Sequence, residues 1–325
     1  MKAIVSVGPG CLELRDLPLP EPGPGQVRIR TAACGICATD LNMIAGWERT
    51  AFPAVPGHEW AGSVDALGAG VDATWAGRRV VAENVWAAGG EVGFEHPGGY
   101  GQYFLTEAAN LQALPPGIPW ARAALAEPLA VAVHALHRLG GDLPGPVLIC
   151  GDGPIGLLLL ALLRRAGRDD VCLIGGRPNR LALALRWGAA RTFDYHQLAQ
   201  GVRDLGGLQS GGFGVVLEAA GSPAALDGAL DIVRPGGRIL VMGDYGEARA
   251  SFAWNQLLHG EFHLLSSNAS AGAWPDAVAL LADERLPLEE LITHRRPAER
   301  FADAFALVRA RDSGAIKVLL EWAPA

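Results

Sequence analysis

The stretch Pro146-Val-Leu-Ile-Cys-Gly-Asp-Gly-Pro-Ile-Gly156 is the most informative segment of the chain. Its run Val147–Cys150 is apolar throughout, which is typical of a parallel strand covered by helices on both faces. The residues after Gly156 are apolar nearly all round, as in a helix buried against such a sheet. Between them lies Gly-x-Gly-x-x-Gly in the strand-to-helix context that the dinucleotide motif requires. The stretch therefore predicts a dinucleotide-binding domain.

Each glycine of this motif has a separate expected role. Gly151 permits a tight turn, Gly153 lets the backbone approach a pyrophosphate, and Gly156 lets the helix pack closely on the strand. Pro154 and Ile155 begin the predicted helix, whose free N–H groups and positive dipole end favour phosphate. These five residues are the first candidate cofactor-binding residues.

Strands and helices alternate from residue 147 to about residue 267, which predicts a doubly wound parallel sheet. A turn is predicted at Pro235–Gly237, before the fifth strand. The expected strands are Val147–Cys150, Val171–Ile174, Arg191–Phe193, Gly214–Glu218, Arg238–Met242 and Phe262–Ser266. The expected helices are Ile155–Ala166, Pro178–Trp187, Ala224–Val233 and a short one near Phe252–Leu258. We assign residues 144–270 to this domain.

Residues 1 to about 110 contain short alternating runs separated by Gly and Pro, which favours a partly closed β-barrel over a βαβ domain. Trp120–Leu139 is predicted as helix, interrupted around Glu127-Pro128. A final strand, Ile316–Glu321, is expected to return to the first domain. Residues 1–143 and 271–325 are therefore assigned to one β-rich domain, with the dinucleotide domain inserted into it.

Composition limits the class of protein. The chain has 325 residues, of which 50% are hydrophobic and 19% charged, as in a globular protein of two domains. Its net charge of −7, without a basic run, argues against nucleic acid. We predict no membrane span and no signal peptide, and therefore a cytoplasmic enzyme. Its five cysteines are then thiols or metal ligands rather than disulfides.

Three short segments carry possible metal ligands: Cys34–Cys37, His58-Glu59 and Glu127. A thiolate, an imidazole and a carboxylate form a three-ligand zinc set that leaves one position for water or substrate. Each segment also has an ordinary explanation, because a buried Cys is usually a small hydrophobic residue and Glu127 could favour a helix start. Spacing alone does not bring the three segments together.

Taken together, the motifs resemble the medium-chain, zinc-type alcohol and polyol dehydrogenases over nearly the whole length. The segments that carry the resemblance are Cys37-Ala-Thr39-Asp40, Gly57-His58-Glu59, Gly98-Gly-Tyr-Gly-Gln-Tyr103, Glu127-Pro128-Leu129, Gly151–Gly156 and Ala315-Ile-Lys-Val318. The resemblance implies a Rossmann sheet inserted into a β-rich, GroES-like catalytic domain, in the α/β class.

The resemblance also implies residue roles. It gives the metal ligands as Cys37, His58 and Glu127, and leaves Cys34 structural. Glu59 matches a neighbouring glutamate that can exchange onto the metal. Thr39 matches the hydroxyl that takes the proton of the substrate, and Asp40 matches a residue that orients a ligand. The expected reaction is hydride transfer between substrate and nicotinamide, assisted by zinc as a Lewis acid.

The sequence departs from the family in its second zinc site. Many relatives hold a structural zinc with four cysteines before the Gly-Gly-Tyr segment, but Val85–Pro97 is short and contains no Cys. We therefore expect one catalytic zinc and no structural zinc. A second departure is Asn42, where a His often serves the proton relay.

The expected coenzyme is NADP(H). NAD-binding domains of this type carry an acidic residue about twenty residues past the glycines. Here Gly175 and Gly176 occupy that place, and Arg177 and Arg180 follow. Guanidinium groups can bind a phosphate through charge-assisted hydrogen bonds. We therefore expect a preference for NADP(H) over NAD(H).

The favoured hypothesis is a zinc-dependent oxidoreductase acting on a small molecule, a secondary alcohol or ketone of a sugar, polyol or cyclitol. One alternative is a biosynthetic reductase of an aldehyde or ketone. Another is a non-catalytic dinucleotide-binding protein, which the combination of Cys37, His58, Glu127 and Thr39 disfavours. The last strand of the predicted sheet would be an exposed edge, so we expect a homodimer or homotetramer.

Overall fold

A computed structural model describes the chain as two compact units. The described residues are 1–47, 49, 51–199, 204–205, 211–246, 253–310 and 312–323. The first unit comprises Met1–Glu127, Trp274–Glu284 and Leu288–Ala325, and the second comprises Pro128–Ala273 and Arg285–Pro287. Helix α3 (Ala126–Leu139), grouped with the first domain in the sequence analysis, therefore belongs mostly to the second unit.

The first unit is built on β3 (Gln26–Gly35), whose alternate residues Val27 and Ile29 are fully buried. Its seven-stranded sheet has the order β14-β15-β3-β4-β5-β7, and β6 also pairs with β3. The bounds are β4 Glu59–Leu67, β5 Arg79–Ala82, β6 Tyr103–Glu107, β7 Leu111–Ala113, β14 Ile292–Pro297 and β15 Lys317–Glu321. Strands β1 (Lys2–Gly8) and β2 (Cys11–Asp16) form a separate hairpin.

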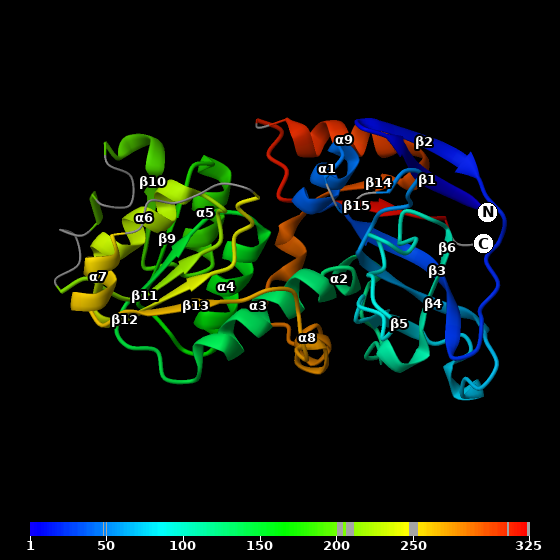
Figure 1. The fold of residues 1–325 in the computed structure, drawn as a ribbon, viewed down its shortest axis with the longest axis horizontal. Coiled ribbons are helices and arrows are strands. Elements are labelled where there is room, and N and C mark those ends of the chain that lie inside the picture. The colour runs from blue at the N-terminus through cyan, green and yellow to red at the C-terminus, as the bar shows by residue number, and fades with distance from the viewer. Residues whose placement is uncertain are drawn as a thin grey trace. The chain divides into compact units, whose positions relative to one another are not determined.

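The final strand does return to the first unit, as the sequence predicted. Leu319 in β15 lies opposite Gly35 in β3, so the C-terminal strand pairs antiparallel with an N-terminal one (Figure 1). The helices of this unit are α1 Ala38–Ala45, α2 Trp120–Ala123, α8 Trp274–Leu280 and α9 Phe301–Arg309. The break in the predicted helix Trp120–Leu139 falls between α2 and α3, just before Glu127, and Pro128 lies in the first turn of α3, where a proline is tolerated.

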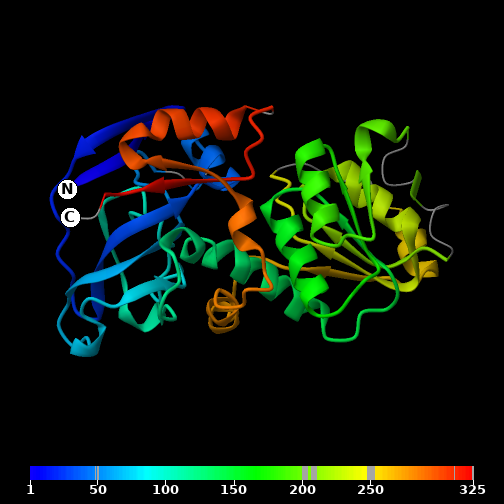
Figure 2. The same ribbon diagram turned by 180° about the vertical axis from the view of Figure 1, so that it is seen from behind.

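The second unit contains a six-stranded parallel sheet, which confirms the doubly wound prediction (Figure 2). Its order is β10-β9-β8-β11-β12-β13, with bounds β8 Val147–Cys150, β9 Val171–Gly175, β10 Arg191–Asp194, β11 Phe213–Glu218, β12 Val233–Val241 and β13 His263–Ser266. The chain proceeds from β8 toward one edge and from β11 toward the other. Ligands of such sheets bind at this change of direction, beyond the carboxyl ends of the strands.

Helices α4 (Pro154–Arg165) and α5 (Pro178–Arg186) pack on β8, β9 and β10, and α6 (Pro223–Ile232) packs on β11 and β12. Two expectations require correction or restriction. The predicted turn Pro235–Gly237 falls within β12, where Gly236 has a φ of +70° and the pairing with β11 is interrupted between Val233 and Arg238. Helix α7 spans Trp254–His259, and Phe252 lies outside the described residues. No described helix is long and apolar enough to cross a membrane.

Candidate functional site

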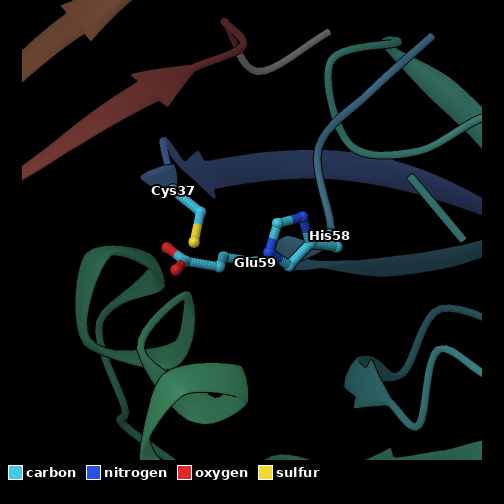
Figure 3. A group of neighbouring side chains, drawn as sticks. All are labelled: Cys37, His58 and Glu59. Carbon is cyan, nitrogen blue, oxygen red and sulfur yellow. The ribbon is translucent and has the colours of Figure 1, made fainter. Parts of the chain in front are cut away.

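Cys37, His58 and Glu59 lie together in the first unit. Their ligand atoms are all within 4.8 Å of one another, and Figure 3 shows the three side chains gathered at one place. Cys37 is the residue before α1, whereas Glu59 begins β4 and His58 precedes it. The pairing of β3 with β4 places Gly35 opposite Glu59 and so joins the two segments. This set of soft and hard donors suits zinc.

Asp40 supports both Cys37 and His58 from the first turn of α1. Its Oδ2 atom accepts hydrogen bonds from the Cys37 amide at 2.8 Å and from the Tyr100 hydroxyl at 2.9 Å. Its Oδ1 atom lies 3.3 Å from His58 Nδ1, and neither atom has another partner among the described residues. A carboxylate behind an imidazole is the usual device for orienting a histidine ligand, so the residues present fit a metal.

The charges of this pair depend on each other. Burial is the largest single effect and would lower the pKa of His58, but Asp40 and Cys37 together outweigh burial and raise that pKa well above its usual value. Burial would raise the pKa of Asp40, but His58 lowers it. Asp40 therefore stays ionised and makes the imidazole a stronger electron donor.

Lys317 lies in the segment Ala315-Ile-Lys-Val318 that carries the resemblance, and it contacts the cluster although no role was predicted for it. Its Nζ atom donates to both oxygens of Glu59, each at 2.7 Å, and both side chains are buried. Burial is the largest single effect and would lower the pKa of Lys317, but Glu59, Cys37 and Glu127 together outweigh burial and raise that pKa. The available signal was its rarity, because Lys2 and Lys317 are the two lysines of the sequence.

Glu127 lies outside the close group of three, although the family resemblance gave it as the third ligand. It stands in the first turn of α3 and still interacts electrostatically with His58, Glu59 and Lys317. Burial, as the largest effect, raises the pKa of Glu127 to about 7. The structure thus brings together three of the four candidate ligands. The fourth, Glu127, is close enough to interact electrostatically with His58 and Glu59.

Cys37 and Cys34 have different surroundings, as the family pattern implies. The hydroxyl of Thr39 lies 3.6 Å from the sulfur of Cys37 and is partly exposed. Cys34 is fully buried, and burial raises the pKa of its thiol well above the usual value. Only Cys37 of these two cysteines is placed as a thiolate ligand would be.

The short segment Val85–Pro97 contributes aromatic side chains, one of which lies beside the metal-ligand candidates. The ring of Phe94 packs against His58, with 4.9 Å between centroids. Trp86 stacks on His96 at 3.9 Å. Arg49 contacts the face of Phe94 and forms ion pairs with Glu91 and Glu95. The segment thus contacts the candidate site directly through Phe94.

In the second unit, the motif glycines are required for steric reasons. Gly151 has a φ of +125°, and a Cβ there would lie 2.9 Å from the backbone of Ala219. A Cβ on Gly156 would lie 2.0 Å from the carbonyl oxygen of Gly151. Around Gly153, in contrast, a Cβ would meet no atom within 4 Å. Gly153, Pro154 and Ile155 therefore stand at an open helix start.

The end of β9 carries features that the sequence reasoning missed. The carboxylate of Asp152 accepts hydrogen bonds from the amides of Gly176 and Arg177. Tyr195, half-exposed and stacked on His196, lies so close to Gly176 that a Cβ there would be 2.2 Å from its ring. Arg180, for which a surface position was the alternative, is buried.

Comparison with known proteins agrees with both halves of this description. Residues 23–116 match the alcohol dehydrogenase GroES-like domain, and residues 154–283 match the zinc-binding dehydrogenase family. The chain is 32% identical over 349 residues to the L-threonine 3-dehydrogenase of Chelativorans sp. (strain BNC1), with 99% of each protein covered.

Two solved structures from Escherichia coli share the fold over nearly the full length. Alcohol dehydrogenase rspB from strain CFT073, complexed with NADH, has a TM-score of 0.92 and 26% identity, with 99% of each chain covered. Galactitol-1-phosphate dehydrogenase has a TM-score of 0.90 and 28% identity, with 99% of this chain and 100% of the other covered. The chain therefore belongs to the zinc-type medium-chain dehydrogenase/reductase family and is an oxidoreductase of the alcohol dehydrogenase type.

Proposed function

We propose that the protein transfers a hydride between NADP(H) and a secondary alcohol or ketone of a sugar, polyol or cyclitol. The observation that carries this proposal is the group Cys37, His58 and Glu59 with the hydroxyl of Thr39 beside it. One similar protein is named as an L-threonine 3-dehydrogenase, and position 3 of threonine carries a secondary alcohol. Another is named for a polyol phosphate, galactitol 1-phosphate. Both names support the proposed substrate class.

One zinc ion is proposed, held by Cys37, His58 and a carboxylate from Glu127 or Glu59. When bound there, zinc would supply Lewis-acid polarisation of the substrate oxygen. Asp40 keeps the imidazole of His58 oriented, and Lys317 holds the carboxylate of Glu59. Thr39 offers a hydroxyl through which the alcohol proton can leave the buried site. The absence of Cys from 85–97 supports one zinc rather than two.

The coenzyme preference is proposed from the corner after β9. Gly175 and Gly176 present no acidic side chain to a ribose 2′-phosphate, and Arg177 and Arg180 follow them. Arg177 is partly exposed, with 43% of its side chain accessible, so its guanidinium can reach a ligand. Charge-assisted hydrogen bonds of about 1.5–3 kcal/mol each would favour the phosphate.

A homodimer or homotetramer is also proposed. Strand β13 is the edge of the parallel sheet, and Leu264 in it is 41% exposed. Nearby in the sequence, Trp254 and Leu258 of α7 are 68% and 69% exposed. Apolar edges of this kind are usually covered by another chain. Light scattering at micromolar concentration should give a multiple of the subunit mass, and the mass of a single subunit would refute this assembly.

The proposed reaction is tested by a screen with both coenzymes. Polyols, sugar alcohols with and without phosphate, aminocyclitols and simple secondary alcohols are mixed with NADP or NAD, and reduced nicotinamide is followed by absorbance. We expect turnover on a secondary alcohol with NADP more efficient than with NAD. Metal analysis of the same sample should give about one zinc per subunit. Turnover confined to primary alcohols would contradict the proposed substrate class.

A further inference from the structure

Asp152, the variable residue between Gly151 and Gly153, reaches across to the end of β9. A Cβ on Gly175 would lie 2.4 Å from the Cβ of Asp152, so this side chain fills the space that a side chain at 175 would enter. Asp152 Oδ2 accepts from the Gly176 amide at 2.9 Å and from the Arg177 amide at 2.8 Å. The corner that lacks an acidic residue in β9 thus receives one from the glycine loop.

The second oxygen of Asp152 faces two guanidinium groups. Oδ1 lies 3.6 Å from Nη1 of Arg177 and 3.8 Å from Nη1 of Arg180. Arg180 also donates to the backbone oxygen of Asp152 at 3.4 Å. Burial and the neighbouring Arg177 lower the pKa of Arg180 to about 10, and the charge of Asp152 opposes them. Two positive charges and one negative charge therefore share this corner.

We propose that Asp152 is a coenzyme-specificity residue: its carboxylate offsets one of the two guanidinium charges and so restrains the preference for NADP(H) over NAD(H). The inference rests on the proposed binding of a dinucleotide at this loop. A ribose 2′-phosphate carries close to two negative charges, whereas the 2′-hydroxyl of NAD carries none. A change in the charge of this corner therefore acts on the two coenzymes unequally, because only the 2′-phosphate differs between them.

The substitution Asp152→Asn isolates this charge. Both backbone amides donate to the same oxygen, Oδ2, so the amide oxygen of Asn can keep both hydrogen bonds. The charge facing Arg177 and Arg180 is removed, and the NH2 group of Asn takes the place of Oδ1. Asp170→Asn is the matched control, because Asp170 pairs with Arg168 at 2.8 Å just before the opposite end of β9.

The probes are 2′,5′-ADP and 5′-AMP, which differ only by the 2′-phosphate and need neither zinc nor turnover to bind. Calorimetry on the full-length variants should show that Asp152→Asn binds 2′,5′-ADP about tenfold more tightly than the wild type does. This factor lies between the Coulomb effect of one charge in water and that of one charge near a protein surface. The affinity for 5′-AMP should change less than about twofold, because 5′-AMP has no charge at that position. Asp170→Asn should leave the ratio of the two affinities unchanged.

A third variant tests whether the effect follows the charge of the corner. Adding Arg177→Gln to Asp152→Asn restores the original net charge, and should return the ratio toward the wild-type value. Thermal denaturation verifies that each variant is folded, and Asp152→Ser removes the same charge if the Asn variant is not. If a folded Asp152→Asn or Asp152→Ser variant binds 2′,5′-ADP no more tightly than the wild type, the inference about Asp152 is overturned, but the proposed dinucleotide site is not. Wild-type protein that binds neither probe would overturn the proposed dinucleotide site with it.

Discussion

The metal-ligand cluster of the first unit and the glycine loop of the second unit are built in opposite ways. The cluster of Cys37, His58 and Glu59 consists of side chains from separate segments, and two of them have a buried partner, Asp40 for His58 and Lys317 for Glu59. The loop depends on missing side chains, because a Cβ at Gly151 or Gly156 would collide with backbone. The first site should therefore fail when atoms are removed, and the second when atoms are added.

The two sites also treat charge differently. Glu59 and Lys317 are almost completely buried, so neither can lose its partner cheaply. Arg177 at the dinucleotide corner keeps 43% of its side chain accessible, and water screens part of its charge. Substitutions in the cluster should thus cost far more than equivalent ones at the corner.

The largest effect is expected for Cys37→Ala, which removes the only thiolate candidate of the cluster. The variant should lose its zinc and nearly all turnover, because a catalytic zinc needs three protein ligands. Metal analysis and a turnover assay measure both. Cys34→Ala is the matched control in the same segment and should keep zinc and activity, since Cys34 is buried away from the ligand role. A Cys37→Ala enzyme that is active without metal would refute the assignment.

Thr39→Val sharpens the comparison by sparing the ligands. It keeps the side-chain volume but removes the hydroxyl, and general acid–base steps contribute about 10²–10⁴-fold. The rate should fall by that order while zinc content stays normal. Asn42→Ala, on the exposed face of the same helix, should have a much smaller effect. Normal turnover of Thr39→Val would mean that the proton leaves by another route.

Lys317→Met tests the buried partner of Glu59. Leaving one charge of such a pair unpaired costs about 3–5 kcal/mol, so the free energy of unfolding in denaturant should fall by that amount. Adding Glu59→Gln should recover a large part of the loss, because the carboxylate no longer needs a counter-charge. If the Lys317→Met variant is as stable as the wild type, Lys317 is not the main partner of Glu59.

The smallest effect is expected from adding one methyl group to the loop. Gly156→Ala should destabilise the second unit by about 1–3 kcal/mol, since its Cβ would press on the Gly151 carbonyl. Gly153→Ala is the control, because its Cβ meets no protein atom within 4 Å. Its melting temperature should stay near that of the wild type while dinucleotide affinity falls. Equal melting temperatures for both variants would show that Gly156 is not a packing position.

Local patterns predicted the second unit well. The strand Val147–Cys150 has the predicted bounds. An apolar run followed by the glycine motif could be recognised because all of its residues are neighbours in the sequence. The turn predicted at Pro235–Gly237 is present as an irregularity inside β12, since Gly236 has a φ of +70°. What the local pattern missed is that β12 begins before this turn, at Val233, because that start depends on pairing with β11 and not on neighbouring residues.

The partners of the site residues were beyond sequence reasoning. Cys37, His58 and Thr39 could be named because they match motifs, but the contact of Lys317 with Glu59 depends on the pairing of β15 with β3. Asp152 stood in the motif itself, yet its direction toward Arg177 depends on where β9 ends. Side-chain directions of this kind follow from the assembled fold and leave no periodic trace in the sequence.

The ion pair between Glu59 and Lys317 has a consequence for how the chain is made, because 258 residues separate its two members. While a ribosome is still adding the second unit, β3 and β4 can already exist, but the carboxylate of Glu59 has no ammonium beside it. Burying it at that stage carries the cost of an unpaired charge. The metal-ligand cluster thus acquires its final electrostatic balance only when β15 emerges and pairs with β3, so a nascent chain that stops short of β15 lacks a balanced site.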